Sequence, residues 1–361
     1  MKLLHKIIQM YNKGNITAAI IMEWENAGLV ESSRARNVLK ETVAQVNQLF
    51  DLSEQDKNVP ELEYLLKYKA PLELIVTYNE SFDSKDIIRF LSGFIGPDNP
   101  NFKLSLLSCP PTKYFELKNH GAEHANADIM LFLDSDVIPQ PNFLIYLFSS
   151  FANTEVNVVG ANVFVEHSTL YSKSYALINF DFQSDETDVI PSYEIPRANS
   201  IAFRKELFKT YKFPPTGSSF KLGIKYLMNN LKAGGIQVYA NLGAQVEHPV
   251  PLAKNFLTRG FFHGRDEMML RQDNKKSQIA KSKSYYKQDT FFGISELSLA
   301  YHRFFRIFKN YKRVNVSIFE LPFALCMILF YYSAVALGYL LTMLFPKQLR
   351  SDKFDYLIMA K

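Results

Sequence analysis

Two aspartates separated by one residue follow directly on an apolar run. The stretch Lys118–Pro141 reads KNHGAEHANADIMLFLDSDVIPQP, and its apolar part ends abruptly at Asp134 and Asp136, before a proline-bearing loop. Two carboxylates at the carboxyl end of a strand can both reach one hard cation or a metal-bound diphosphate. The pattern therefore predicts that Asp134 and Asp136 face a hard cation or a metal-bound diphosphate.

The chain around these aspartates consists of short apolar runs that alternate with helical patterns. Candidate strands are Ile16–Trp24, Leu72–Tyr78, Lys103–Cys109, Asp128–Asp134 and Val156–Val165, and candidate helices are Ser32–Phe50 and Asp83–Phe94. Apolar strands between helices are typical of an α/β sandwich with a largely parallel, buried sheet. In such sheets ligands bind beyond the carboxyl ends of the strands, which is where the two aspartates would lie.

The composition excludes several other classes of protein. A chain of 361 residues can bury a large core, and 47% hydrophobic with 21% charged residues excludes a disordered chain. Two cysteines exclude a disulfide scaffold or a Cys-rich zinc module. The net charge of +5 is concentrated in residues 271–313, which hold eleven Lys/Arg and three acids and leave the rest at about −3. Because this basic segment adjoins an apolar one, we expect a membrane partner and no nucleic acid.

The apolar segment Leu321–Phe345 carries no charge over about 25 residues, enough to span a bilayer. We therefore expect a transmembrane helix over residues 316–346. More cations precede it than follow it, which by the positive-inside bias places the large N-terminal part in the cytoplasm, at the inner membrane. Alternatively, Pro322 and Gly338 would let the segment bend back or lie in the interface. No export signal is evident at the N-terminus, where residues 1–14 form an amphipathic pattern, so a reducing compartment is expected.

The run LKNHGAEHANADIMLFLDSD resembles the Arg/Lys-Asn-x-Gly, helix, strand and Asp-x-Asp run of family-two glycosyltransferases of the GT-A fold. The resemblance covers roughly residues 15–270. It implies a Rossmann-like three-layer α/β/α domain with a mostly parallel mixed sheet, to which the C-terminal membrane helix is appended. It also implies an inverting transfer of sugar from a nucleotide-diphosphate donor, most simply a UDP-sugar, to a glycan or lipid-linked acceptor, in cell-envelope polysaccharide assembly. A basic linker (271–315) and a tail (347–361) complete the expected layout.

The resemblance also assigns roles to individual residues. Donor-binding residues would be Glu25, Asn26, Asn79, Lys118, Asn119 and Asp134; acceptor-side residues Arg197 and Asn199; ligands of Mg²⁺ or Mn²⁺ Asp134, Asp136 and His248. In the segment RGFFHGRD, Arg259 and His263 share a helical face with Asp266, and Arg265 is adjacent. Arg259, His263 and Arg265 would close over the diphosphate, unless this is simply an amphipathic surface helix.

The sequence departs from the family where the catalytic base is expected. Inverting transfer needs a base for the acceptor hydroxyl, which the family supplies from a Glu-Asp pair. Gly223 and Ile224 stand at those positions, and no Asp or Glu occurs between Glu206 and Glu247. Acids upstream of the acceptor segment are Asp181, Asp185, Glu186, Asp188 and Glu194. Among them we assign Glu194 as the base.

Two other functions fit parts of the pattern. The missing acid pair suits a membrane-tethered pseudo-glycosyltransferase that binds a nucleotide or a partner without catalysis. The run IMLFLDSDV also matches the opening of haloacid-dehalogenase-type phosphatases, in which the first Asp is a nucleophile. That opening normally lies near the start of the domain, whereas more than a hundred residues precede it here.

Overall fold

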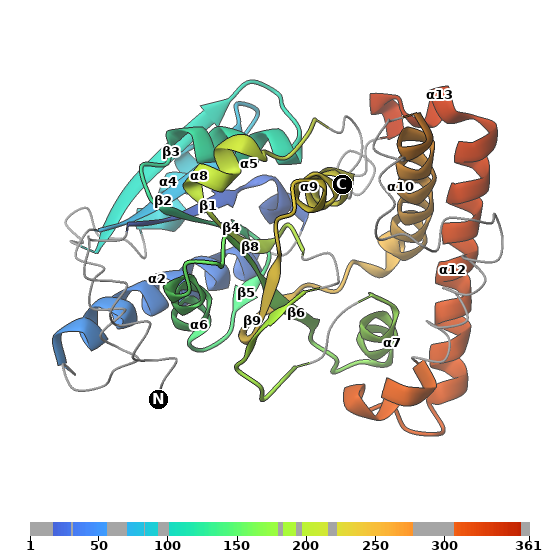
Figure 1. Ribbon diagram of the computed structural model, residues 1–361. Helices are drawn as coiled ribbons and strands as arrows, with labels where there is room; N and C mark the ends of the chain where they lie inside the picture. Colours follow the sequence, from blue (N-terminus) through green and yellow to red (C-terminus); the bar gives the residue numbers. More distant parts are fainter. Residues whose placement is uncertain are drawn as a thin grey trace. The chain divides into compact units, whose positions relative to one another are not determined.

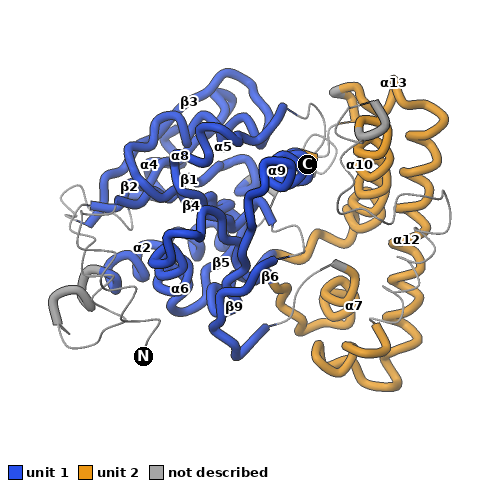
Figure 2. Tube along the Cα trace, in the orientation of Figure 1, with its two compact units in different colours: residues 1–163, 183–216, 223–248 blue, residues 164–182, 217–222, 249–361 orange. Residues whose placement is uncertain are grey.

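The computed structural model describes residues 17–29, 32–55, 71–82, 84–92, 101–179, 183–192, 197–215, 222–276 and 307–354. The predicted N-terminal amphipathic segment, Asp181, Glu194 and most of the basic linker lie outside these residues. The described chain divides into two compact units (Figure 2). Unit 1 comprises residues 1–163, 183–216 and 223–248, and unit 2 comprises residues 164–182, 217–222 and 249–361.

A mixed sheet organises unit 1, with strand order β3-β2-β1-β4-β8-β6-β9-β5 and β7 paired to β9. The strands are β1 Ala18–Glu23, β2 Leu72–Asn79, β3 Phe102–Cys109, β4 Ile129–Asp134, β5 Ile138–Pro139, β6 Val158–Val165, β7 Val189–Pro191, β8 Ser200–Arg204 and β9 Tyr239–His248. The pairs β1–β2, β1–β4 and β2–β3 are parallel, and β4–β8, β6–β8, β5–β9 and β7–β9 are antiparallel. The parallel half is the part whose strands are separated by helices in the sequence.

Helices lie on both faces of this sheet (Figure 1). Unit 1 contains η1 Glu25–Leu29, α2 Ser32–Gln55, α4 Ser84–Ser92, α5 Tyr114–His124, α6 Phe143–Ser149, η2 Ser150–Ala152, α8 Lys205–Thr210 and α9 Leu222–Ala233. Helices α5, α8 and α9 cover one face, and α2 and α6 cover the other (Figure 1). The three-layer α/β/α arrangement expected from the sequence is confirmed.

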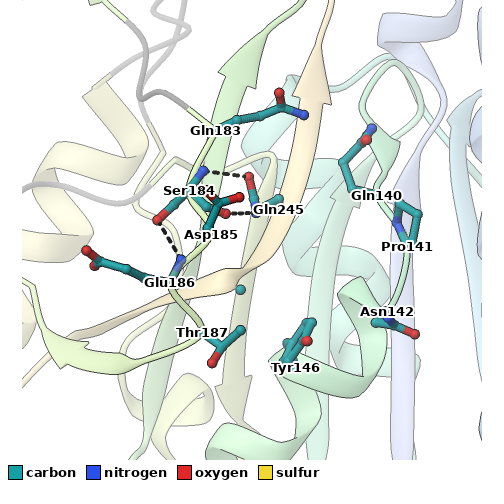
Figure 3. Close-up of a pocket in the computed structure, with 11 residues that line it drawn as sticks. Gln140, Pro141, Asn142, Tyr146, Gln183, Ser184, Asp185, Glu186, Thr187 and Gln245 are labelled. Atoms are coloured by element: carbon teal, nitrogen blue, oxygen red, sulfur yellow. Dashed lines mark hydrogen bonds between the residues drawn. The ribbon is translucent and has the colours of Figure 1, made fainter. Parts of the chain in front are cut away.

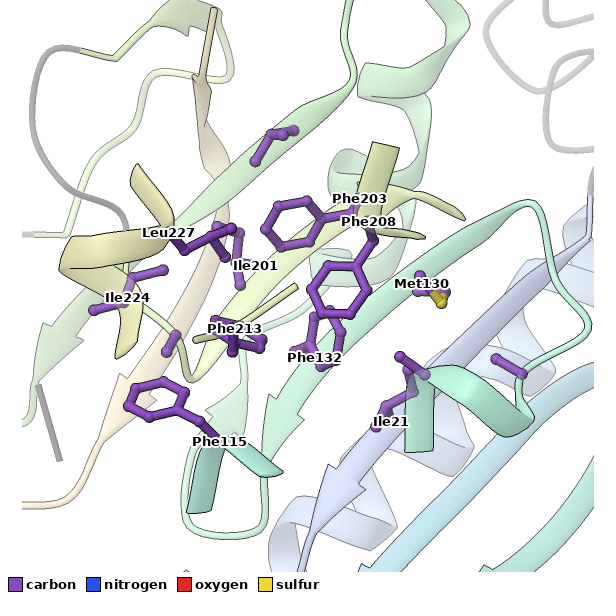
Figure 4. Close-up of a cluster of buried hydrophobic side chains, with 14 of the residues drawn as sticks. Ile21, Phe115, Met130, Phe132, Ile201, Phe203, Phe208, Phe213, Ile224 and Leu227 are labelled. Atoms are coloured by element: carbon purple, nitrogen blue, oxygen red, sulfur yellow. The ribbon is translucent and has the colours of Figure 1, made fainter. Parts of the chain in front are cut away.

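An aromatic cluster fills the layer between the sheet and α5, α8 and α9 (Figure 4). The ring of Phe132 on β4 lies 4.8 Å from Phe208 and 5.2 Å from Phe213, centroid to centroid. Phe115 at the start of α5 lies 5.1 Å from Phe213. Each such pair adds about 0.5–1.5 kcal/mol beyond the burial of its area. The cluster fixes α5 against the strand that ends in Asp134.

Unit 2 is mainly helical. Its elements are α7 Leu170–Asn179, η3 Ala253–Asn255, α10 Phe256–Lys276, η5 Tyr311–Val314, α12 Leu321–Leu344, α13 Pro346–Leu349 and η6 Asp352–Phe354. Helix α12 coincides with the apolar segment predicted from the sequence, and by length and composition it can cross a membrane. Helices α10 and α12 run side by side (Figures 1 and 2).

Candidate functional site

Three polar side chains meet in register where the parallel strands end. Glu23 on β1 pairs with Thr77 on β2 on one side and with Asp134 on β4 on the other. Glu23 and Thr77 are fully buried, and Asp134 is 4% exposed. The carboxyl ends of parallel strands therefore bring two carboxylates side by side at one edge of the sheet.

Asp134 is held by a cation and two neutral donors. The ammonium of Lys118 lies 2.5 Å from Oδ1, and the Tyr114 hydroxyl donates to the carboxylate at 2.7 and 2.8 Å. The side-chain amide of Asn26 donates to Oδ2 at 3.0 Å. Lys118 is fully buried, so the pair is shielded from solvent. The structure brings together Asn26, Lys118 and Asp134, three of the predicted donor-site residues.

Gly121 explains why the Lys-Asn-x-Gly motif precedes this strand. A Cβ at Gly121 would lie 2.5 Å from Cγ2 of Ile21 and 3.1 Å from Cγ2 of Thr77. Only glycine lets α5 approach β1 and β2 this closely. Lys118 lies three residues earlier, on the same side of the helix, and so reaches the end of β4. The motif thus sets the position of the cation relative to Asp134.

Burial raises the pKa of the Glu23 carboxyl well above its ordinary value. The neighbouring Asp134 acts in the same direction, whereas Lys118 opposes it. Oε1 of Glu23 is buried and has no hydrogen-bond partner among the residues that the structure describes, and Oε2 accepts from the backbone N–H of Asn26 at 3.3 Å. Burial and the adjacent carboxylates also raise the pKa of Tyr114, which keeps it a neutral donor to Asp134.

A second polar group joins β2 to the loop before α5. The side-chain amide of Asn79 donates to Glu25 and, at 3.2 Å, to the carbonyl of Thr112. The backbone N–H of Thr112 donates back to Oδ1 of Asn79 at 2.7 Å. Glu25 and Asn79, both predicted to lie beside the nucleotide base, are therefore in direct contact, and both are buried.

Arg34 on α2 links the Asp-x-Asp loop to the end of β9. Its Nε donates to the carbonyl of Asp136 at 2.6 Å, and its Nη atoms donate to the side chain and carbonyl of Glu247 at 3.0 and 2.8 Å. Ile138 pairs with Glu247 in the antiparallel register of β5 and β9. Continuing that register brings Asp136 and His248 to the same end of these strands.

The sequence predicts that Asp136 and His248 hold a hard divalent cation, and this stays a prediction. Asp136 and His248, at 7% and 8% exposed, would supply one carboxylate and one imidazole. Among the described residues, no group of three or more His, Cys, Asp or Glu side chains is arranged to hold a metal.

Other predicted site residues lie elsewhere or have structural contacts. The side chain of Asn119 exchanges hydrogen bonds with the backbone of Phe213 at 2.7 and 3.1 Å. The carbonyl of Asn199 accepts from the backbone N–H of Asp134 at 3.0 Å, and Arg197 is half-buried two residues earlier. The backbone of Asn199 therefore lies beside Asp134.

Arg259, His263 and Arg265 lie on α10 in unit 2. The His263 ring is within 2.5 Å of the Tyr331 hydroxyl, and the Arg259 guanidinium lies 5.9 Å from the Tyr175 ring centroid. Arg265 is fully buried, pairs with Asp266 at 2.8 Å and donates to the carbonyl of Phe354. These contacts hold unit 2 together, and a role toward a diphosphate stays a prediction.

At Gly223, where the resemblance to the family places the acid pair, the space is filled by an aromatic ring. A Cβ at Gly223 would overlap the ring of Phe115, and Ile224 belongs to the buried cluster. Core packing therefore replaces the expected acid at this place. Glu194, the predicted base, lies outside the described residues.

A polar cavity of about 280 Å³ lies beside β5 and β9 in unit 1. The loop 183–187 faces Gln140 and Asn142 across it (Figure 3). Gln245 fastens this loop: its amide donates to the carbonyl of Ser184 at 2.6 Å and accepts from the backbone N–H of Ser184 at 3.2 Å. Asp185 and Glu186, two of the upstream acids, line the cavity.

Sequence reasoning missed Glu23, Arg34 and Tyr114. Glu23 follows five apolar residues of β1, just as Asp134 follows those of β4, so a strand ending in an acid was a usable signal. Arg34 and Tyr114 had no such signal, because their partners are 102 and 20 residues away in the chain.

One family of known proteins matches part of the chain. Residues 114–212, which include α5, β4 and the two aspartates, match the family described as glycosyl transferase family 2. This match confirms the resemblance inferred from the sequence and supports glycosyl transfer. No curated protein matches the chain by sequence.

Two solved structures are similar to this chain. One is the mannosyltransferase PcManGT from Pyrobaculum calidifontis in complex with GDP-Man and Mn²⁺, at 14% identity and a TM-score of 0.47, covering 99% of this chain and 92% of that one. The other is GalNAc-T7 with UDP, GalNAc and Mn²⁺, at 12% identity and a TM-score of 0.47, covering 83% of this chain and 56% of that one.

Proposed function

We propose that the chain is a metal-dependent, inverting glycosyltransferase that moves a hexose from a nucleotide-diphosphate sugar to a glycan or lipid-linked acceptor. The observation that carries the proposal is the buried ion pair of Asp134 and Lys118 at the carboxyl ends of the parallel strands. Asp134 lies two residues before Asp136 in the sequence. It lies within the segment that matches the glycosyltransferase family. Beyond that edge an α/β sheet binds its ligands.

The residues of unit 1 divide into two groups in this proposal. Glu25, Asn79 and Asn26 contact the nucleoside, where their amide and carboxylate groups pair with the polar edges of the base and ribose. Lys118, Tyr114 and Arg34 are positioning residues, because each acts on Asp134 or the backbone of Asp136. The donor is most simply a UDP-sugar.

Asp136 and His248 would hold Mg²⁺ or Mn²⁺ together with the diphosphate. A bound cation of this kind stabilises the charge that the leaving diphosphate gains. Asp134, whose oxygens accept from Lys118, Tyr114 and Asn26, is better suited to the ribose than to the metal.

For the acceptor side we propose Glu194 as the general base, with Arg197 and Asn199 nearby in the chain. The reaction would take place at the cytoplasmic face of the inner membrane, where the basic segment before α12 favours an anionic leaflet. With a lipid-linked acceptor, the reaction would belong to cell-envelope polysaccharide synthesis.

Trp24 offers a direct test of donor binding. It is the sole tryptophan, 5% exposed, and lies between Glu23 and Glu25. Titration of the full chain with nucleoside diphosphates, with and without Mn²⁺, should change its fluorescence and raise the melting temperature, since a ligand of the folded state stabilises it. Asp136→Ala should abolish the Mn²⁺-dependent part of both the fluorescence change and the rise in melting temperature, whereas Asp185→Ala should retain it. No response to any nucleotide would refute the proposal.

A second candidate is a pseudo-glycosyltransferase that binds a nucleotide without turnover. The filled space at Gly223 favours it, because the usual acid has no room there. The two candidates give the same binding result but differ in donor cleavage, which only the enzyme would accelerate.

A further inference from the structure

Helix α12 has one uncharged, mostly apolar exposed face. Phe323, Phe330, Leu337 and Leu344 recur every seven residues and are 65%, 66%, 52% and 62% exposed. Residues at this spacing lie on one stripe of a helix. The stripe formed by the next residues, about 100° round the helix, includes Ala324, Tyr331 and Gly338 and is buried. Helix α12 therefore exposes apolar side chains on one side only.

The buried stripe is in backbone contact with α10. A Cβ at Gly264 would overlap the carbonyl of Val335, and a Cβ at Gly338 would overlap the carbonyl of Phe261. A Cβ at Gly260 would lie 2.9 Å from the carbonyl oxygen of Tyr331. With no side chains between the two helices at these points, α10 and α12 form one body. If α12 inserts into a membrane to a given depth, α10 must insert to the same depth.

Helix α10 is too polar to enter hydrocarbon. Its charged residues include Arg259, Arg265, Asp266, Glu267, Arg271 and Asp273. A charged residue at the centre of a bilayer costs about 2.5–3.5 kcal/mol on insertion scales. The contacts continue to the end of α12, where Gln272 donates to the carbonyl of Thr342 and Arg271 to the hydroxyl of Tyr339.

The first half of α12 also packs against α7. Lys173 pairs with Glu320 at 3.1 Å, and the rings of Tyr175 and Tyr331 lie 6.3 Å apart. The Tyr332 hydroxyl donates to the carbonyl of Ile178 at 3.4 Å. A perpendicular α12 would thus draw polar helices into the membrane along both of its halves.

Exposed cations lie at both ends of α12. Lys309, Lys312 and Arg313 precede it, and Lys347 and Lys353 follow it, all exposed. The stretch 307–319 contains no acid. A helix lying flat presents both groups to a single layer of anionic headgroups, whereas a crossing helix presents them to opposite leaflets.

We propose that α12 is an in-plane membrane anchor. Its stripe of Phe323, Phe330, Leu337 and Leu344 lies at the boundary between headgroups and acyl chains of an anionic bilayer, while α7 and α10 stay on the aqueous side. The helix has the length to cross, but its packing within unit 2 favours the flat arrangement. This inference concerns unit 2 alone and does not depend on glycosyl transfer.

Depth measurements on the full chain test the orientation. Three full-length variants each carry one exposed cysteine for labelling with a fluorophore, while Cys109 stays in place and is buried. The first keeps the natural Cys326. The other two combine Cys326→Ser with Ser333→Cys or with Leu340→Cys. The protein is bound to vesicles of phosphatidylglycerol and phosphatidylcholine that contain nitroxide lipids. A flat helix places all three labels at one shallow depth, about 5–10 Å below the surface. A crossing helix shifts successive labels by about 10 Å, and that result would overturn the proposal.

Substitution of the face provides an independent readout. Leu337→Glu should weaken binding to phosphatidylglycerol vesicles by about tenfold or more, because a charge replaces an inserted side chain. The matched control is Leu104→Glu, an exposed leucine on β3 in unit 1, which should bind like the unaltered chain. Equal binding of both variants would refute the anchor. Dimers that Leu337→Glu dissociates, with vesicle binding unchanged, would show instead that a second copy covers this face.

Discussion

Replacing Lys118 by Met should destabilise unit 1 through the charge left behind on Asp134. The ammonium lies 2.5 Å from Oδ1 of Asp134, and the two side chains are 0% and 6% exposed. Methionine retains most of the aliphatic volume, so the main change is the loss of the cation. The buried Glu23 then adjoins Asp134 with no positive charge beside it.

The expected cost is about 3–5 kcal/mol, the range for removing one partner of a buried pair. Tyr114 and Asn26 still donate to Asp134, which favours the lower end. In the double variant Lys118→Met/Asp134→Asn neither charge is present, and we expect at least half of the loss to be recovered. The single variant Asp134→Asn completes the double-mutant cycle.

Trp24 makes the measurement specific to unit 1. Its position after β1 places it in the structure that the pair supports, so its emission reports the unfolding of this unit in urea. The four proteins are compared as full chains in the same detergent. A loss below about 1 kcal/mol for Lys118→Met, or no recovery in the double variant, would contradict a shielded ion pair.

Further variants test the rest of the site. Gly121→Ala should lower the free energy of unfolding by about 1–3 kcal/mol and reduce turnover, because the added Cβ pushes α5 and Lys118 away from the sheet. Identical urea unfolding curves for Gly121→Ala and the unaltered chain would refute this. Glu23→Gln should be more stable than the unaltered chain in EDTA at neutral pH. The raised pKa of this acid makes stability fall as pH rises above its ordinary value of 4.5, and the variant should lack that fall in a pH series of urea midpoints. Arg34→Gln should raise the Mn²⁺ concentration needed for half-maximal activity about tenfold, since it frees the loop of Asp136; an unchanged requirement would count against it. Glu194→Gln should lower turnover about 100-fold or more with donor KM retained, while Glu186→Gln should not; equal rates would remove Glu194 as the base.

Much of the fold followed from local patterns. The strand predicted at Leu72–Tyr78 is β2 Leu72–Asn79, whose apolar run is buried throughout. The strand predicted at Lys103–Cys109 is β3 Phe102–Cys109, a partly exposed strand at the edge of the sheet. The apolar segment is α12 to within one residue. The strand β8 at Ser200–Arg204 was not predicted, because five residues leading into a helix carry little periodic signal.

The site was predictable where its residues share a motif. Lys118 and Asp134 were found because they occupy one run, and the structure joins them. Arg34 was not, because it contacts the Asp-x-Asp loop only through the fold. The helical spacing of Arg259 and His263 correctly indicated a shared helix, but spacing says nothing of the partner, which for His263 is Tyr331 on α12. Sequence periodicity shows which residues share a face of a helix, but it does not identify the residues that this face contacts.

We propose that this chain binds a nucleotide-sugar beside Asp134 and Asp136, cleaves it there and transfers the sugar. The most direct measurement is the release of nucleoside diphosphate from a panel of UDP- and GDP-sugars, with Mn²⁺ and membrane extract as the acceptor source. We expect release with at least one donor, coupled to sugar incorporation, and a loss of about 100-fold or more in Asp136→Ala but not in Asp185→Ala. Nucleotide binding without release, or equal release by Asp136→Ala, would contradict the account.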